Sequence, residues 1–214
     1  MKIKKVLRVL LMIAPVLMVL AVYGKLPDVV PVHWGINGEV DRYGSKMELF
    51  IIAGMNIFLG IFMPLVAKVD PKKKNYDRFQ ETYEWMIIWT LLFMTVVTGV
   101  ILVETLKPGT LNIGKVICSM VGIMFIVLGN MMPKIKSNFF TGVKTPWALS
   151  SDAVWNKTQR LGGKTLVLGG VLILISAFVG DAKWMTFIII GVAVLVGLVP
   201  TVMSYIWYQK EMEK

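Results

Sequence analysis

The sequence predicts an all-α polytopic integral membrane protein with six transmembrane helices. Hydrophobic residues make up 56% of the 214 residues and charged residues only 17%, whereas a soluble domain carries about 25% charged residues. The apolar residues gather into six stretches, and several reach the roughly 20 residues that cross about 30 Å of hydrocarbon. The basic residues gather between these stretches in an alternating pattern, which supports the same helix count.

The first apolar stretch follows four basic residues, as a signal peptide would. Its end, Ala21-Val22-Tyr23, places a large aromatic residue where cleavage needs a small one, so we expect a retained helix. The fifth stretch reaches full length only if residues 161–164 are added. The six stretches are Val6–Tyr23, Leu49–Ala67, Met86–Leu106, Ile113–Met132, Thr165–Val179 and Trp184–Trp207.

The distribution of Lys and Arg predicts the orientation. Seventeen lie in the N-terminal tail, residues 68–85, residues 133–164 and the C-terminus, and six lie on the other side. Because cytoplasmic loops carry the excess of Lys and Arg, both termini are predicted to be cytoplasmic and loop 24–48 to face outward. This distribution explains the net charge of +10, so the sequence predicts contact with the lipid bilayer and no direct nucleic-acid partner.

The outward loop 24–48 is predicted to contain a short hairpin. Pro27 and Pro31 disfavour a helix, and Asn37-Gly38 is a turn signal that follows Val32-His33-Trp34. An irregular cap is the alternative interpretation.

The cytoplasmic turn 68–85 contains the basic run Lys72–Lys74. Attraction to anionic lipid, at about 1 kcal/mol for each basic residue, explains this run. Docking of a protein partner is the alternative.

A long polar and aromatic insert runs from Pro133 to Lys164. A connection of this length is more often functional than a plain linker.

Within the insert, Ser150 or Ser151 is suited to cap a helix. Such a helix would be short and amphipathic, would lie on the inner leaflet between the fourth and fifth membrane helices, and would turn into the fifth at Gly162-Gly163. Its apolar face would hold Val154, Trp155, Thr158 and Leu161, and its polar face Asn156, Lys157, Gln159 and Arg160. Trp147 and Trp155 are predicted at the membrane interface with a hydrated indole N–H.

Small residues at four-residue spacing predict close helix packing rather than a channel lining. One ladder contains Gly114, Cys118 and Gly122, and the other contains Ala193, Gly197 and Thr201. Cys118 is the only cysteine, so no intramolecular disulfide can form, and we expect it to be a small packing residue.

No catalytic site, metal site or cofactor site is predicted. The only histidine, His33, lies near Asp28, Glu39 and Asp41, but a single imidazole with scattered carboxylates lacks the spacing of a zinc site. Ion-coupled transporters carry ionisable residues at mid-membrane depth. Glu104 and Lys115 lie near the outer ends of apolar stretches, where they are expected to pair across the short loop or to reach water.

The stretch Asn138–Gly163 resembles the signature of the SdpI family of bacterial membrane immunity proteins. The outward loop, with Leu26-Pro27 and His33-Trp34-Gly35, is similar to the N-terminal module often joined to that signature. Together with six membrane helices, the resemblance covers essentially the whole chain. The matching signature residues are Asn138, Phe140, Gly142, Thr145, Pro146, Trp147, Leu149, Val154, Trp155, Thr158, Arg160 and Gly162.

Three positions depart from this signature. Lys144 stands where the family usually has arginine, Ala148 where it has threonine, and Gln159 where it has histidine. Lys144 keeps the charge but loses the bidentate fork. Gln159 removes a titratable group, which favours a structural role for that position.

The resemblance implies an N-terminal two-helix module over residues 1–67 and a four-helix SdpI-like module over residues 68–214. It also implies a protein of the bacterial cytoplasmic membrane, without catalysis, that protects the cell from a secreted membrane-active toxin peptide. In the best-known family arrangement, such a protein also captures a cytoplasmic repressor.

The contact residues of the insert would then be Lys144, Trp147 and Trp155, and Pro146 would fix its path. Anchoring of Thr145-Pro146-Trp147 to the interface is the alternative role for the insert. Resistance by export through a small-solute or peptide transporter, and a membrane enzyme that uses His33, are the alternative functions.

Overall fold

The computed structural model describes residues 2–35 and 38–213 and confirms a helical protein with six candidate membrane-spanning helices. Each is long and apolar enough to cross a bilayer. The spanning helices are α1 (Lys2–Val22), α2 (Glu48–Val69), α3 (Gln80–Leu106), α4 (Ile113–Met131), α6 (Asp152–Val179) and α7 (Ala182–Met212). The shorter elements are η1 (Tyr23–Lys25), η2 (Lys73–Arg78), η3 (Met132–Lys134) and α5 (Pro146–Ser150).

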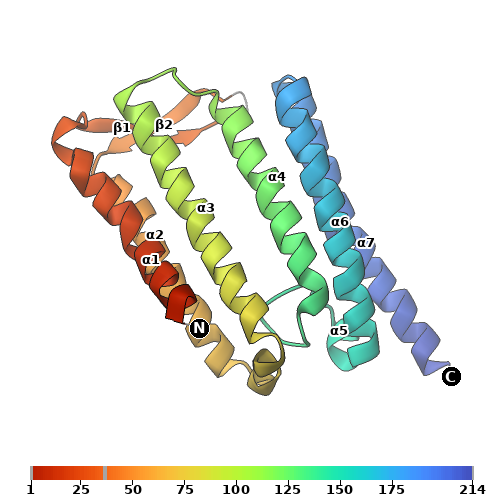
Figure 1. The fold of residues 1–214 in the computed structure, drawn as a ribbon. Coiled ribbons are helices and arrows are strands. Elements are labelled where there is room, and N and C mark those ends of the chain that lie inside the picture. The colour runs from red at the N-terminus through yellow and green to blue at the C-terminus, as the bar shows by residue number, and fades with distance from the viewer. Residues whose placement is uncertain (1, 36–37, 214) are drawn as a thin grey trace.

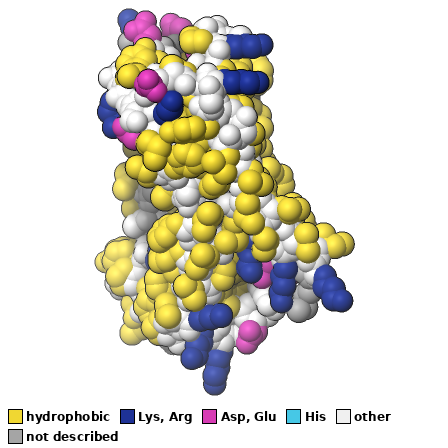
Figure 2. Space-filling model, turned by 90° about the vertical axis from the view of Figure 1, so that its left-hand side faces the viewer, with side chains coloured by type: hydrophobic (Ala, Val, Ile, Leu, Met, Phe, Trp, Pro, Cys, Tyr) yellow, Lys and Arg dark blue, Asp and Glu magenta, His cyan; other side chains and the backbone are white. Residues whose placement is uncertain are grey.

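The two chain ends lie at the same end of the helix bundle, together with α5, and a β-hairpin covers the opposite end (Figure 1). Hydrophobic side chains cover the middle of the face shown in Figure 2, and Lys and Arg side chains gather toward its two ends. This distribution is the one expected of a surface whose middle contacts hydrocarbon.

The predicted hairpin is confirmed. Strands β1 (Val29–Trp34) and β2 (Val40–Ser45) pair antiparallel. Asn37 of the predicted turn lies outside the described residues, but Gly38 has a φ of +78°, a conformation that glycine adopts without strain. Val30 on the inner face is fully buried against the ends of α1, α2 and α3 that lie nearest the hairpin, so the hairpin packs onto the bundle.

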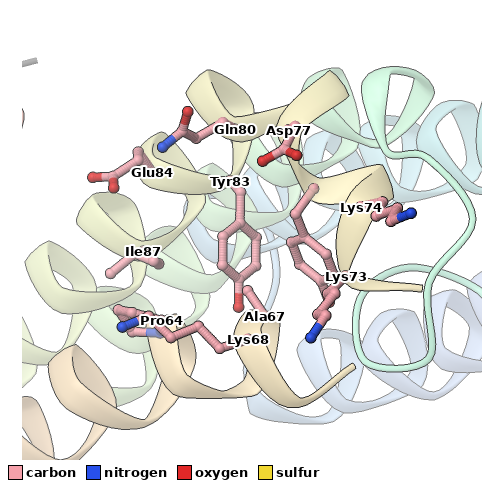
Figure 3. A pocket seen from close by; sticks show the side chains of 11 residues that line it. Pro64, Ala67, Lys68, Lys73, Lys74, Asp77, Gln80, Tyr83, Glu84 and Ile87 are labelled. Carbon is pink, nitrogen blue, oxygen red and sulfur yellow. The ribbon is translucent and has the colours of Figure 1, made fainter. Parts of the chain in front are cut away.

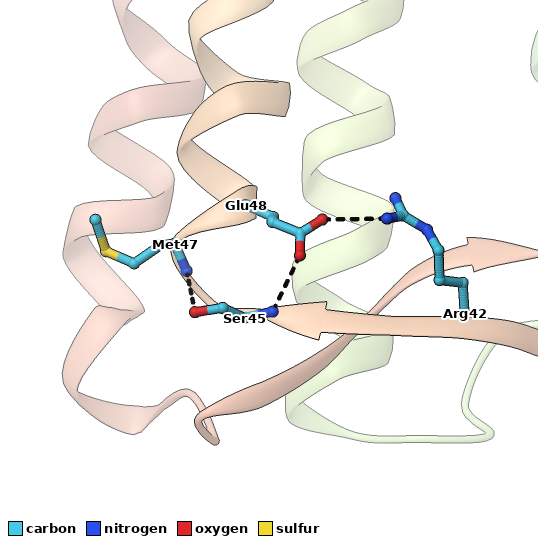
Figure 4. Close-up of polar contacts among 4 residues, drawn as sticks. All are labelled: Arg42, Ser45, Met47 and Glu48. Atoms are coloured by element: carbon cyan, nitrogen blue, oxygen red, sulfur yellow. Dashed lines mark hydrogen bonds and ion pairs between the residues drawn. The ribbon is translucent and has the colours of Figure 1, made fainter.

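Glu48 joins the hairpin to α2 (Figure 4). Its carboxylate accepts a hydrogen bond from the Ser45 backbone N–H at 3.2 Å and lies 3.5 Å from the Arg42 guanidinium. The Met47 backbone N–H donates to the Ser45 hydroxyl at 3.3 Å. The second bond satisfies the N–H of Met47, the N-cap residue of α2, which the helix itself leaves without a partner, and the first ties the end of β2 to α2.

Helices α1, α2 and α3 pack together, and α4, α6 and α7 form a second group. Asn56, buried in the first group, donates through its side-chain N–H groups to the Leu11 carbonyl at 2.8 Å and the Thr95 hydroxyl at 2.8 Å. It therefore ties α2 to α1 and α3 inside an apolar layer.

Glycines set the close contact between α4 and α6. A Cβ atom at Gly122 would lie 2.8 Å from the Gly170 carbonyl, and one at Gly129 would lie 2.8 Å from the Gly163 carbonyl. The first predicted ladder thus packs against a helix, and Cys118 is buried beside Ile173 and Met185. The second ladder does not, since Ala193 and Gly197 are exposed and a Cβ at Gly197 would meet nothing within 4 Å.

Three local expectations are corrected. The segment expected as a separate amphipathic helix is the first part of the continuous helix α6, which begins after the N-cap Ser151 and does not break at Gly162-Gly163. The short helix between the fourth and fifth spanning helices is α5. Of the two alternatives for Glu104 and Lys115, pairing is not found: Lys115 is exposed, and the buried Glu104 accepts from the backbone N–H of Gly109 at 2.5 Å and of Leu111 at 3.3 Å.

Candidate functional site

The insert between α4 and α6 folds back against α6 and α7 at the end of the bundle that holds the chain ends (Figure 1). Five of its polar side chains are buried and hydrogen-bonded, namely Ser137, Asn138, Thr145, Thr158 and Gln159. The signature positions expected from the sequence therefore divide into a buried framework and a smaller exposed set.

Asn138 organises the turn before α5. Its side chain is fully buried; its oxygen accepts from the backbone N–H groups of Phe140 and Thr141 at 2.9 and 2.6 Å, and its amide donates to the Lys136 and Thr141 carbonyls. An Asn side chain that bonds backbone groups in this way replaces the hydrogen bonds of a regular turn. Asn138 thus fixes the path of the chain.

Asp70 joins this turn to the end of α2 and was not expected from the sequence. Its buried carboxylate accepts from the Phe139 backbone N–H at 2.9 Å, the Tyr76 hydroxyl at 3.1 Å and the Lys72 backbone N–H at 2.6 Å. The Tyr76 hydroxyl also lies 3.2 Å from the Asn138 side-chain oxygen. Burial and the Asp70 carboxylate raise the pKa of Tyr76 above its usual range, because each disfavours the phenolate.

Lys72 makes a second connection to the insert. Its ammonium donates to the Ser137 hydroxyl at 2.7 Å and the Leu149 carbonyl at 3.0 Å, and lies 5.7 Å from the centre of the Phe139 ring. The first lysine of the run Lys72–Lys74 therefore has a structural role within the protein.

Gln159 fills the position where the family usually has histidine. It was expected on the polar face of the helix, but it is fully buried. Its amide accepts from the Val143 N–H at 3.0 Å and donates to the Val143 carbonyl at 2.8 Å. A Cβ at Gly142, whose φ is +93°, would collide with the Gln159 side-chain oxygen, so these two residues fit only together.

Trp155 and Thr158 also belong to the buried framework. Trp155 is 1% exposed, and its indole N–H donates to the Ile135 carbonyl at 2.8 Å. The expectation of a Trp155 ring at the membrane interface with a hydrated N–H is therefore wrong. Thr158, fully buried, donates to the Val154 carbonyl.

Thr145, Pro146 and Trp147 begin α5. The Thr145 hydroxyl accepts from the Ala148 N–H at 3.0 Å and shares a 2.8 Å hydrogen bond with Ser204 of α7. Pro146 occupies the first helical position, where its missing N–H is not needed. Trp147 is half-buried, edge-on to Tyr205 at 5.1 Å between ring centres.

Several aromatic and basic side chains of the insert are exposed. Lys144 is exposed, and its ammonium donates to the Phe140 carbonyl at 3.1 Å. Phe139 and Phe140 are 43% and 45% exposed, and Arg160 is exposed on α6. Phe139, Phe140 and Lys144 thus form an aromatic and basic surface beside the buried framework.

The second group of expected residues lies in the hairpin at the other end of the bundle. His33 is exposed, and its Nδ1 lies 2.6 Å from an Asp41 oxygen. Trp34 is half-buried, and the Gly35 backbone N–H donates to the Glu39 carbonyl at 2.9 Å. His33, Trp34 and Gly35 line one wall of a pocket of about 370 Å³, whose other walls come from α3, α4 and α7.

The pocket is predominantly apolar away from the hairpin, with Val97, Ile101, Ile113 and Met185 among its lining residues. Among residues 2–35 and 38–213, no three His, Cys, Asp or Glu side chains are grouped so as to hold a metal ion. The arrangement is suited to hold an apolar side chain or lipid tail at the hairpin end of the bundle.

Comparison with known proteins supports the resemblance carried by these residues. Residues 134–204 match the model of the SdpI/YfhL protein family, and residues 10–57 match a domain of unknown function, DUF1648. The chain is 28% identical to the immunity protein SdpI of Bacillus subtilis over 216 aligned positions, which cover 97% of each chain. It is also 43% identical to an uncharacterized protein of Archaeoglobus fulgidus over 50 residues, 23% of this chain and 27% of the relative. No solved structure matches the chain.

The resemblance to the SdpI family and to its N-terminal module is thereby confirmed. The matched segment 134–204 includes the buried framework of the insert. The three residues that contact this framework from outside the segment lie in the turn between α2 and α3; they are Asp70, Lys72 and Tyr76.

Proposed function

We propose that this protein of the SdpI family is a membrane immunity protein that protects the cell from a secreted, membrane-active toxin peptide. The observation that carries the proposal is the similarity to the immunity protein SdpI along 97% of both chains, which extends through both ends of the bundle. The hydrogen bonds of Asn138 and Thr145 agree with it, because both residues of the proposed signature take part in a formed, buried framework.

The orientation is part of the proposal. With both chain ends and the insert in the cytoplasm, the side richer in Lys and Arg faces inward, as the positive-inside rule requires. The hairpin then faces outward in the bacterial cytoplasmic membrane. The two-module division at residue 67 also stays a proposal.

The toxin peptide is proposed to meet the protein at the hairpin. His33 and Trp34 place a polar, aromatic edge over the apolar pocket between α3, α4 and α7. A membrane-active peptide carries apolar side chains for the pocket and polar groups for its rim. No covalent chemistry is assigned to this contact.

A signalling role is the finer proposal. The exposed Phe139 and Phe140 supply aromatic side chains of the kind enriched in protein interfaces, and the exposed Lys144 lies beside Phe140 and adds a positive charge. This surface would dock a cytoplasmic repressor protein. Trp147 of α5 is half-buried against Tyr205 of α7. A movement of α7 would therefore be passed through Trp147 to α5 and to that surface.

The test is the survival of a toxin-sensitive bacterium without an immunity protein of its own, challenged with an SDP-type toxin peptide. Strains would express the parent protein or Trp147→Ala, and membrane abundance would be measured by blot. Protection by the parent supports the immunity function. If Trp147→Ala reaches normal membrane abundance but no longer protects, the insert has a direct role. If membrane abundance and protection fall together, the insert only anchors the protein.

Export of the toxin by this protein would replace the immunity proposal with a transporter function. Energy-dependent efflux of labelled toxin from cells or proteoliposomes would indicate a transporter. An abundant parent protein that gives no protection would contradict the immunity function toward this toxin.

A further inference from the structure

A pocket of about 590 Å³ lies between the end of α2 and the segment formed by η2 and the start of α3 (Figure 3). It belongs neither to the hairpin nor to the signature insert. The pocket lies where two spanning helices leave the apolar middle of the bundle, beside the exposed apolar residues Leu65 and Val69. A lipid in the surrounding bilayer therefore has access to it.

One part of the pocket is apolar and held in a fixed shape. Pro64, Ala67 and Ile87 line it together with the Tyr83 ring. The Tyr83 hydroxyl donates to the Met63 carbonyl at 2.6 Å, so this aromatic wall is held against α2. Such a surface fits the glycerol and upper acyl region of a lipid.

A basic group borders the pocket. Lys68, Lys73 and Lys74 line it and are exposed. Within the described part of the chain these three ammonium groups make no hydrogen bond or ion pair, in contrast to the neighbouring Lys72. Their donors are therefore free to bind phosphate oxygens, for which lysine is a common ligand.

Two carboxylate side chains and one amide side chain lie across the Tyr83 ring from Lys68 and Lys73 (Figure 3). They belong to Asp77, Glu84 and Gln80, which also line the pocket. Glu84 is 3.8 Å from the Arg8 guanidinium through one oxygen, and its other oxygen is buried without a hydrogen-bond partner. Asp77 is exposed, which leaves its carboxylate accessible to a cation.

We propose that this pocket binds a phospholipid whose headgroup carries both a phosphate and a primary ammonium, as in phosphatidylethanolamine. The phosphate lies against Lys68 and Lys73, the ammonium against Asp77 and Gln80, and the acyl chains follow Pro64 and Ile87 toward the bilayer. The separation of Lys68 and Lys73 from Asp77 on two sides of one ring gives each charged group of a zwitterionic headgroup a partner of opposite sign.

The bound lipid would also contact the framework of the insert. Tyr76 lines the pocket, and its hydroxyl bonds the buried Asp70 and approaches Asn138. Tyr76 thus lies between a headgroup in the pocket and the turn that Asn138 organises.

Native mass spectrometry of the full chain in detergent tests the proposal. The protein would be titrated with phosphatidylethanolamine, phosphatidylglycerol or phosphatidylcholine, and with glycerophosphoethanolamine as a soluble headgroup without acyl chains. We expect retained phosphatidylethanolamine adducts, weakened roughly thirtyfold in Lys68→Gln/Lys73→Gln. Asp77→Asn should reduce the preference for phosphatidylethanolamine over phosphatidylglycerol.

Lys157→Gln/Lys164→Gln is the matched control, because it removes two exposed lysines of α6 outside the pocket. Equal loss of adducts in this control would overturn the site, as would unchanged adducts in Lys68→Gln/Lys73→Gln. Stronger binding of phosphatidylglycerol than of phosphatidylethanolamine would overturn the ammonium contact. Displacement of the lipid by equimolar glycerophosphoethanolamine would show that the ligand is a soluble phosphate compound and overturn the lipid assignment.

Discussion

The side-chain amide of Gln159 pairs with the backbone of a single residue, Val143, through two hydrogen bonds of 3.0 and 2.8 Å. The amide serves as acceptor and donor at once, so both main-chain polar groups of Val143 are satisfied inside the protein. This pairing gives an uncharged side chain a complete structural role at position 159. At this position the side chain holds the insert to α6.

Gln159→Leu should therefore destabilise the protein. It leaves the Val143 N–H and carbonyl without partners, at about 1–3 kcal/mol for each buried group. Thermal unfolding in detergent would measure the loss, and Lys157→Leu on the exposed side of the same helix is the control. Equal unfolding temperatures for the two variants would contradict the structural role of Gln159.

Gly142→Ala should disturb the same contact from the other side. The φ of +93° at Gly142 disfavours any residue with a Cβ by about 1–2 kcal/mol, and the added methyl group would collide with Gln159. We expect lower membrane abundance and a lower unfolding temperature. Gly191→Ala, where a Cβ meets nothing within 4 Å, should leave both unchanged; an equal loss there would indicate a general intolerance of glycine replacement.

The membrane helices and the hairpin could be predicted because their signals are local. Twenty apolar residues suffice to mark a span, and two prolines with Asn37-Gly38 suffice to suggest a hairpin. The continuity of α6 across Gly162-Gly163 was not predictable in this way. These glycines permit close packing, Gly163 against Gly129 of α4, rather than a break in the helix.

The roles of Trp155 and Asp70 required the tertiary structure. An apolar helix face in a membrane protein can meet lipid or another part of the protein, and the spacing of Trp155 does not distinguish the two. Asp70 bonds the Phe139 N–H, 69 positions away in the sequence. The only local signal was a carboxylate placed directly after a spanning helix and before three lysines.

Tyr76 should give the protein an alkaline sensitivity. Burial and Asp70 raise its pKa above the usual 10.0, so above pH 10 the unfolded chain loses a phenolic proton that the folded protein retains. The folded state then binds more protons, and stability falls as pH rises, by up to about 1.4 kcal/mol for each pH unit. Tyr76→Phe should lose less stability between pH 9 and 11 in denaturant titrations. An identical alkaline loss in both proteins would assign the effect to other groups.

Trp155 and Trp147 should respond differently to substitution, although both were expected at the membrane interface. Trp155 is 1% exposed and donates to Ile135, so Trp155→Ala opens a cavity and removes a hydrogen bond, at about 3–5 kcal/mol. Trp155→Phe keeps most of the ring but leaves the Ile135 carbonyl without its donor, at about 1–3 kcal/mol. Trp147 is half-buried against Tyr205, so Trp147→Ala should cost less than either. Unfolding temperatures in detergent, with membrane abundance beside them, test this order. A larger loss in Trp147→Ala than in Trp155→Ala would mean that α5, rather than the buried indole, holds the insert in place.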